Sequence, residues 1–426
     1  MDNPYIWVNT IFVTIILTLY LGVLNRIKKQ KIHLYIYTTV WALLVFGNQI
    51  IGPPYLVSIE TLVVVYLAWI TFYFGSICVY LYYANEKNGA DREVVYSATR
   101  LKTALYLLIV LSILANYFYF QNAASKLQGL ANLAMLRSSE AREVLTESNM
   151  FFNLFGRSYN IYIPMAFLLF NKKKLSPYIL AIIVIIALAT SASTFTRAPI
   201  LNVLICVLVS VVLSGKKIRL NALTASFALG FVGLLYYLTN EINTKLSLVK
   251  VKNADELFVN TVYVYIFGGI RAYQDILEGQ YIDHQEKYYD AHAYSLDFLH
   301  YFLKRLGFIE EYPRLIREYM RGADIPTNVY TYLDCFTLDL GIAGALIGSF
   351  LLGIITTYIA VQAQFKRTIT MTTMYCFCCF GLAIIFMNNE FIRNTVFLML
   401  IPLAFVEFIA RFNMNSDDSD DAVSSI

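Results

Sequence analysis

Long apolar runs joined mostly by short polar links constrain the fold of this chain more than any other feature. A bilayer core is about 30 Å thick, so a helix needs roughly 20 mainly apolar residues to cross it. Backbone polar groups find no water at that depth, and runs rich in Leu, Ile and Val therefore predict helices. We expect an all-α polytopic membrane protein.

The apolar runs predict eleven transmembrane helices. They lie near 6–24, 34–56, 58–83, 103–120, 151–171, 175–192, 198–214, 220–239, 338–362, 370–387 and 395–412. The chain then divides into a first bundle segment (1–239), one long polar insertion (240–337) and a last bundle segment (338–412). Residues 413–426 are acidic and rich in serine, which predicts a disordered tail.

Composition excludes an ordinary soluble domain, since 58% of the residues are hydrophobic and only 15% are charged. The net charge of +4 is spread over short links, which argues against a nucleic-acid partner. The six cysteines lie mostly inside apolar runs and indicate neither a disulfide framework nor a metal site. Gly344 and Gly348 predict a close helix contact.

The basic residues orient the spans, because Lys and Arg accumulate in short cytoplasmic links. Alternation through eleven helices places every basic link on the cytoplasmic side; these links are 26–31, 87–102, 172–174, 216–219 and 366–367. The N-terminus and the long insertion then lie outside. In a bacterial inner membrane that side is the periplasm, where nucleotide sugars are absent, so we expect a lipid-linked substrate.

Within the insertion, residues 258–270 are apolar but too short to span, which suits a re-entrant or interfacial helix with Arg271 at its end. Apolar residues from Leu296 to Leu306 recur at helical spacing and predict a helix lying on the membrane or against the bundle. Pro313 opens a further helix, on which three arginines share one face: Arg314, Arg317 and Arg321. This face either binds phosphate or is solvated and pairs with nearby glutamates.

Several charges stand near or within spans. Arg197 lies in the turn before 198–214, close to the end of a span. An arginine at the depth of a span is expected to face a cavity or a partner. Glu60 and Arg157 are single charges that either form internal packing pairs or have a functional role. Asn389, Glu390 and Arg393 form a polar turn between the last two spans. Glu407 and Arg411 predict an i,i+4 ion pair.

Three patches carry a family resemblance: Asn328-Val-Tyr-Thr-Tyr-Leu-Asp-Cys-Phe-Thr-Leu-Asp-Leu-Gly, Thr194-Phe-Thr-Arg-Ala-Pro and Gly268-Gly-Ile-Arg. With the layout of the whole chain, they resemble the O-antigen polymerase (Wzy) family. The resemblance implies a fold similar to GT-C glycosyltransferases. It also implies a polymerase that joins undecaprenyl-pyrophosphate-linked oligosaccharides, with no cofactor and no metal. Its partners would be the donor and acceptor, membrane lipid and a chain-length regulator protein.

In such a reaction a pyrophosphate leaves, and arginines stabilise its developing charge. The resemblance implies Arg197 and Arg271 as the first choices for this role, with Arg314 and Arg317 next. Substrate binding would also involve Arg157, Arg321 and Arg393. The acceptor hydroxyl needs positioning and a base, for which the candidates are His292, Asp334 and Asp339. Asn328 and Tyr330 either shape the acceptor site or, for Asn328, cap a helix.

Two other functions fit the same layout. A lipid-linked oligosaccharide flippase or another transporter is also a helical bundle with interior arginines, but it does not need the long insertion, and the sequence shows no repeated halves. An O-antigen ligase shares both layout and chemistry with the polymerase.

Overall fold

The fold is described from a computed structural model of the chain. It describes residues 4–26, 31–51, 56–84, 95–126, 150–192, 197–214, 254–279, 294–309, 331–365, 368–387, 389–392, 394–411 and 422–424.

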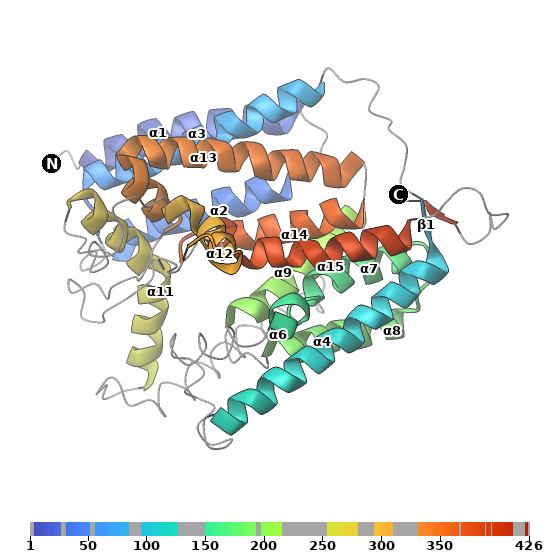
Figure 1. Ribbon diagram of the computed structural model, residues 1–426. Coiled ribbons are helices and arrows are strands. Elements are labelled where there is room, and N and C mark those ends of the chain that lie inside the picture. The colour runs from blue at the N-terminus through green and yellow to red at the C-terminus, as the bar shows by residue number, and fades with distance from the viewer. Residues whose placement is uncertain are drawn as a thin grey trace. The chain divides into compact units, whose positions relative to one another are not determined.

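Helices dominate the described residues (Figure 1). They are α1 (Pro4–Arg26), α2 (Ile32–Ile51), α3 (Ile59–Ala84), α4 (Ala98–Lys126), α6 (Met150–Phe155), α7 (Tyr159–Asn171), α8 (Pro177–Ala192), α9 (Arg197–Leu213), α11 (Ala254–Leu277), α12 (Asp297–Arg305), α13 (Leu333–Phe365), α14 (Ile369–Ala383) and α15 (Asn394–Ala410), with short 3-10 helices η2 (Tyr294–Leu296) and η3 (Glu390–Ile392). Two short strands, β1 (Val95–Ser97) and β2 (Ala422–Ser424), pair antiparallel.

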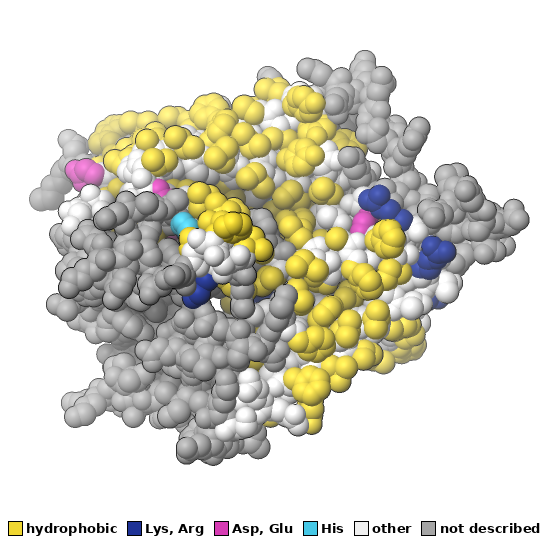
Figure 2. Space-filling model, viewed as in Figure 1, with side chains coloured by type: hydrophobic (Ala, Val, Ile, Leu, Met, Phe, Trp, Pro, Cys, Tyr) yellow, Lys and Arg dark blue, Asp and Glu magenta, His cyan; other side chains and the backbone are white. Residues whose placement is uncertain are grey.

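Five of these helices are long and apolar enough to cross a membrane, and four shorter ones are also apolar. The long ones are α1, α2, α3, α4 and α13. Large hydrophobic side chains such as Ile50, Tyr178 and Phe408 are exposed, and Figure 2 shows hydrophobic side chains over much of the described surface. Lipid tails suit such a surface far better than water does. The prediction of a multi-pass, all-α membrane protein is confirmed, while eleven spans and the GT-C likeness stay predictions.

Several boundaries differ from the sequence prediction. The predicted span 151–171 is two helices, α6 and α7, separated by a turn at 156–158. The predicted helix 258–270 extends to Leu277, so Arg271 lies inside it and not at its end, because polar side chains beyond Arg271 find partners on neighbouring elements. The predicted span 220–239 lies outside the described residues.

Three residues of the predicted tail, Ala422–Ser424, form β2. Val95 pairs with Ser424, Tyr96 with Val423 and Ser97 with Ala422. These tail residues carry no charge, and the backbone groups of β1 give them hydrogen-bonding partners. The rest of the predicted tail lies outside the described residues, and its disorder stays a prediction.

Contacts divide the chain into two compact units, each made of separate stretches of sequence. Unit 1 comprises 1–89, 251–361 and 381–396, and unit 2 comprises 90–250, 362–380 and 397–426. The described part of the long insertion, α11 and α12, therefore belongs with the first three helices of the chain. Each unit is considered by itself below.

In unit 1, α1 packs on α3, and α3 packs closely on α13 (Figure 1). A Cβ at Gly75 would lie 2.2 Å from the Phe350 carbonyl oxygen, and one at Gly353 would lie 2.1 Å from that of Phe72. Glycine lets two helix backbones approach this closely. The core beside them is aromatic, with the Tyr37 ring stacked on Phe72 at 3.8 Å between centroids.

The helix α13 begins with a hairpin. Leu340 and Gly341 have non-helical backbone angles, and Gly341 has a φ of 64°, which favours glycine. The Tyr332 hydroxyl lies 2.6 Å from the Ser349 Oγ, although 17 residues of straight helix would span about 25 Å. Residues 333–339 therefore fold back along the following segment. We call residues 331–350 the α13 hairpin.

The hairpin explains Gly344 and Gly348. Both pack on Phe336: a Cβ at Gly344 would lie 2.1 Å from its carbonyl oxygen, and one at Gly348 would lie 2.5 Å from its ring. The predicted close contact is confirmed, and its partner is the preceding segment of the same element.

In unit 2, α7 packs against α4, α8 and α9. Tyr96 on β1 fixes two further elements, since its hydroxyl donates to Glu407 Oε1 (2.6 Å) and accepts from the Ile369 N–H (3.0 Å). The predicted ion pair between Arg411 and Glu407 is confirmed, with 3.5 Å between Nη2 and Oε1. The five cysteines other than Cys78 are buried, and all six are free.

Candidate functional site

The polar residues of α11 form the candidate site, and three contacts hold this helix in unit 1. Phe267 fills the space above Gly47 of α2, where a Cβ would lie 2.6 Å from its Cζ. The Ser58 N–H donates to Gln274 Oε1 (2.9 Å), and the Tyr273 hydroxyl shares a hydrogen bond with Thr337 Oγ1 (2.9 Å). Helix α11 is thus fixed against α2, the start of α3 and the α13 hairpin.

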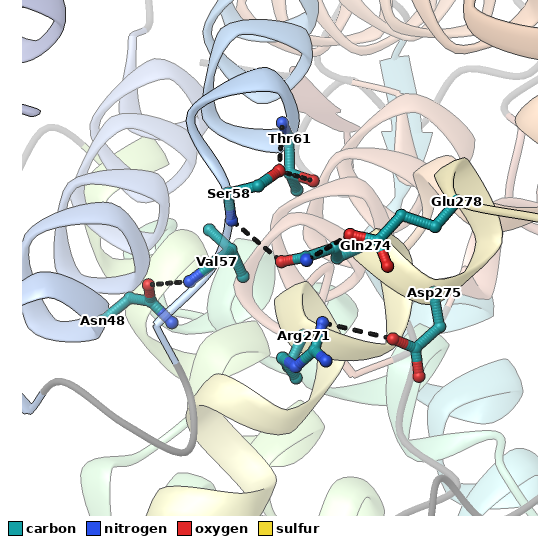
Figure 3. A network of polar contacts seen from close by, with 8 residues as sticks. All are labelled: Asn48, Val57, Ser58, Thr61, Arg271, Gln274, Asp275 and Glu278. Atoms are coloured by element: carbon teal, nitrogen blue, oxygen red, sulfur yellow. Dashed lines mark hydrogen bonds and ion pairs between the residues drawn. The ribbon is translucent and has the colours of Figure 1, made fainter. Parts of the chain in front are cut away.

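Figure 3 shows the resulting network of polar side chains. Gln274 occupies its centre, because it also donates to the Glu278 carboxylate while accepting from Ser58. Asn48 on α2 accepts from the Val57 N–H (3.2 Å), and Ser58 Oγ accepts from the Thr61 N–H (3.2 Å). These bonds satisfy the backbone N–H groups of Val57 and Thr61 beside the point where α11 docks.

This network lies at a defined end of the bundle. Helix α2 begins directly after the basic link at 26–31 and ends at Ile51, close to Ser58. Since α11 contacts Ser58, it sits at the end of α2 that is opposite the basic link. In the predicted topology this is the outer end.

Arg271 and Asp275 form an ion pair one turn apart on α11. Their Nη1 and Oδ1 atoms are 3.1 Å apart, and both side chains remain partly accessible, at 21% and 18%. The contact lacks the geometry of a hydrogen bond, and the guanidinium donates none to any residue that the structure describes. Nη1 is buried beside Asp275, and the side chain as a whole keeps enough exposure for its other N–H groups to meet an oxyanion.

Burial raises the pKa of Asp275, and the neighbouring Arg271 lowers it by less. Desolvation thus disfavours the carboxylate more than its ion pair favours it.

The two predicted aspartates differ in role. Asp339 accepts hydrogen bonds from the Tyr294 N–H (2.6 Å) and the Ser295 N–H (2.8 Å), and also from the Ser295 hydroxyl. It anchors η2, and with it α12, to the hairpin, so its carboxylate is already engaged. Asp334 is 1% exposed in the first turn of the hairpin, and its charge contributes to raising the pKa of Tyr273, after the larger effect of burial.

The predicted polar turn before the last span is present, and part of it serves the hairpin. Asn389 donates to the Cys335 Sγ (3.1 Å) and accepts from the Phe391 N–H (3.1 Å). Glu390 is buried, at 5% exposure. Arg393 lies outside the described residues.

The other predicted residues are placed as follows. Arg197 is the first residue of α9 in unit 2, and Arg157 is half-buried in the turn between α6 and α7 of the same unit. Glu60 is exposed in the first turn of α3, where a negative charge favours the helix dipole, so it is no internal packing pair. Outside the described residues lie His292, Arg314, Arg317, Arg321, Asn328 and Tyr330.

Sequence reasoning missed the ion pair of Arg271 with Asp275 and the contact between Ser58 and Gln274 that positions α11. The spacing of Arg271 and Asp275 is i,i+4, which is a visible signal for an ion pair. Gln274 and Ser58 gave no such signal, because 216 residues separate them.

Comparison with protein-family models, curated proteins and solved structures finds no match to this chain.

Proposed function

We propose that this chain is a membrane glycosyltransferase that joins undecaprenyl-pyrophosphate-linked oligosaccharide repeat units at the outer face of a bacterial inner membrane. Its product would be O-antigen or a similar surface polysaccharide. One observation carries the proposal: Arg271, on a helix of the long polar insertion, donates no hydrogen bond to any residue that the structure describes and is held at the predicted outer end of unit 1. The resemblance to the O-antigen polymerase family adds to it.

The proposed step transfers the growing chain. A hydroxyl of the acceptor repeat unit attacks the anomeric carbon of the donor, the bond from that carbon to the pyrophosphate oxygen breaks, and the hydroxyl proton passes to a base. The departing pyrophosphate takes the place of Asp275 beside Arg271, and the guanidinium of Arg271 stabilises the charge of the pyrophosphate. Arg197, in unit 2, stays a candidate from the sequence alone. Of the three proposed bases, Asp334 and His292 remain, since Asp339 is engaged with η2.

Gene disruption followed by gel analysis of surface polysaccharide tests the function. The polymerase predicts that long chains vanish while a single capped repeat survives. Loss of the single repeat as well would indicate the flippase or the ligase instead. An unchanged pattern would refute all three.

Site variants test the arginine. Arg271→Ala is expected to lower polymerisation by about 10²-fold or more, as for other lost oxyanion donors. Arg271→Lys should restore only part of it, because lysine lacks the planar pair of donors. Arg411→Ala serves as the control, since Arg411 is exposed and pairs with Glu407. If Arg271→Ala and Arg197→Ala both polymerise normally at equal protein level, the assignment is wrong.

A further inference from the structure

Helix α12 begins where the α13 hairpin turns. Asp339 accepts hydrogen bonds from the backbone N–H groups of Tyr294 (2.6 Å) and Ser295 (2.8 Å), which lie in η2, directly before α12. Asp339 stands two residues before Gly341, where the chain of the hairpin reverses. The start of α12 is therefore tied to the tip of the hairpin (Figure 1).

The long arm of α13 fixes the depth of this tip. It comprises residues 342–365 and ends directly before the basic link at 366–367. At 1.5 Å per residue the arm is about 36 Å long, and a tilt of about 20° leaves about 34 Å along the bilayer normal. The hydrocarbon core is only about 30 Å thick. The tip and the start of α12 therefore lie near the bilayer boundary that is opposite the basic link.

Helix α12 has one apolar face, and this face remains exposed. Leu296, Leu299, Leu303 and Leu306 follow one another at i, i+3, i+7 and i+10, which places them on one side of a helix. Leu296 is 40% exposed, Leu299 41% and Leu306 69%. The sequence left this helix either on the membrane or against the bundle. Packing against the bundle would have buried these side chains, so their exposure favours the membrane.

The end of α12 extends the same face. Gly307 has a φ of 78°, and the N–H groups of Gly307 and Phe308 donate to the carbonyl groups of Lys304 (3.1 Å) and Leu303 (2.9 Å). These two bonds form a Schellman motif, which turns the chain back over the last turn of the helix. The motif brings Phe308 to the side of α12 that carries Leu303, and Phe308 is 74% exposed.

Two further observations indicate that lipid covers this face. The exposed apolar side of α13, which includes Leu351, continues to Ile342 and Leu340 at the tip of the hairpin, where α12 starts. The exposed Lys304 lies about 140° around the helix from Leu299. A helix with leucine and phenylalanine on one side and a basic residue on the other is typical of helices that lie between lipid headgroups and acyl chains.

We propose that α12 is an interfacial helix that lies in the bilayer boundary opposite the basic link at 366–367. Its apolar face inserts among the first methylene groups of the lipid chains; this face consists of Leu296, Leu299, Leu306 and Phe308. Lys304 meets lipid phosphates from the other side of the helix. Asp339 sets the depth, because it ties the start of α12 to the tip of a spanning helix.

This inference goes beyond the proposed function. It holds for a polymerase, a ligase or a flippase alike, because it concerns where α12 lies and not which reaction occurs at Arg271. Its test measures position without any turnover, so it stands or falls independently of the proposed activity.

Fluorescence quenching in vesicles tests the position of α12. The full-length protein carries Cys78→Ser, because the other five native cysteines are buried. A nitrobenzoxadiazole label is attached to one added cysteine, at Leu299→Cys, Phe308→Cys or Lys304→Cys. The protein is reconstituted into vesicles of phosphatidylcholine and phosphatidylglycerol, and the parent with Cys78→Ser alone gives the background signal.

Lipid that is brominated close to its headgroup should quench the labels at Leu299 and Phe308 at least about threefold more strongly than the label at Lys304. Iodide in the buffer should show the reverse order, because the polar side of an interfacial helix faces water. Leu351→Cys, on the exposed side of α13, is the matched control for a label that lipid quenches and iodide does not reach.

Two results would overturn the proposal. Equal quenching by iodide at Leu299 and Lys304 would place α12 in water. Protection of the labels at Leu299 and Phe308 from both quenchers would show that protein covers the apolar face, as in an interface between two copies of the chain. A single peak on size exclusion guards against loss by unfolding, and Phe308→Cys keeps the test decisive if Leu299→Cys does not fold.

Discussion

The contact between α3 and α13 gives a quantitative prediction about stability. Replacing Gly353 by alanine places a methyl group 2.1 Å from the Phe72 carbonyl oxygen. This is about 1.3 Å short of the 3.4 Å at which ordinary contact begins. The nearest atoms belong to backbone, so no side-chain rotation relieves the clash and the two helices must separate.

Overpacking of this kind costs about 1–3 kcal/mol. Alanine favours a helix by up to about 1 kcal/mol over glycine, which offsets part of the cost. A 1.3 Å clash with backbone belongs in the upper half of the overpacking range, which leaves a net cost of about 1–2 kcal/mol. In a unit of this size each kcal/mol shifts the melting temperature by about 2–4 °C, so Gly353→Ala should lower it by about 2–8 °C. Gly75→Ala, on the opposite helix of the same contact, should behave alike.

Thermal unfolding of the purified protein in detergent measures this shift. The control is Gly22→Ala, since no atom lies within 4 Å of a Cβ at that exposed position of α1. It should leave the melting temperature unchanged or raise it slightly. If Gly353→Ala melts within about 1 °C of Gly22→Ala, the close approach of α3 and α13 is refuted.

Two further predictions concern individual side chains. Burial raises the pKa of Asp275, so the folded state favours the protonated carboxyl. The unfolded chain has a pKa of about 4 for this group. As the pH rises above that value, the carboxyl ionises more readily in the unfolded chain than in the folded one, and the free energy of unfolding falls. Asp275→Asn should therefore gain melting temperature over the parent on going from pH 4.5 to pH 7.5, and a constant difference would refute the desolvation argument. Tyr96→Phe removes a hydroxyl that joins Glu407 and Ile369 and should cost about 1–3 kcal/mol in unfolding free energy. Tyr178→Phe, at an exposed position, should cost nothing measurable, and equal stability of the two variants would contradict the role of Tyr96.

Local chemistry made part of this fold readable from the sequence. Hydropathy located α1 and α3 to within a few residues, because a helix in lipid needs only its own apolar side chains to be stable. The pairing of Glu407 with Arg411 followed from i,i+4 spacing in the same way. Hydropathy failed at Gly156, where Asn116 from 40 residues away holds the break in the helix.

Hydrophobic length and charge are properties of short segments, so the sequence was enough to predict a chain that crosses a membrane repeatedly and carries isolated arginines. Which groups those arginines meet depends on how the helices pack. Among the described residues, packing leaves Arg271 with an ion pair but no hydrogen bond, and it commits Asp339 to anchoring η2. The reason is that Ser58 and Gln274, or Tyr294 and Asp339, become neighbours only when distant segments pack, and no local pattern encodes such pairs.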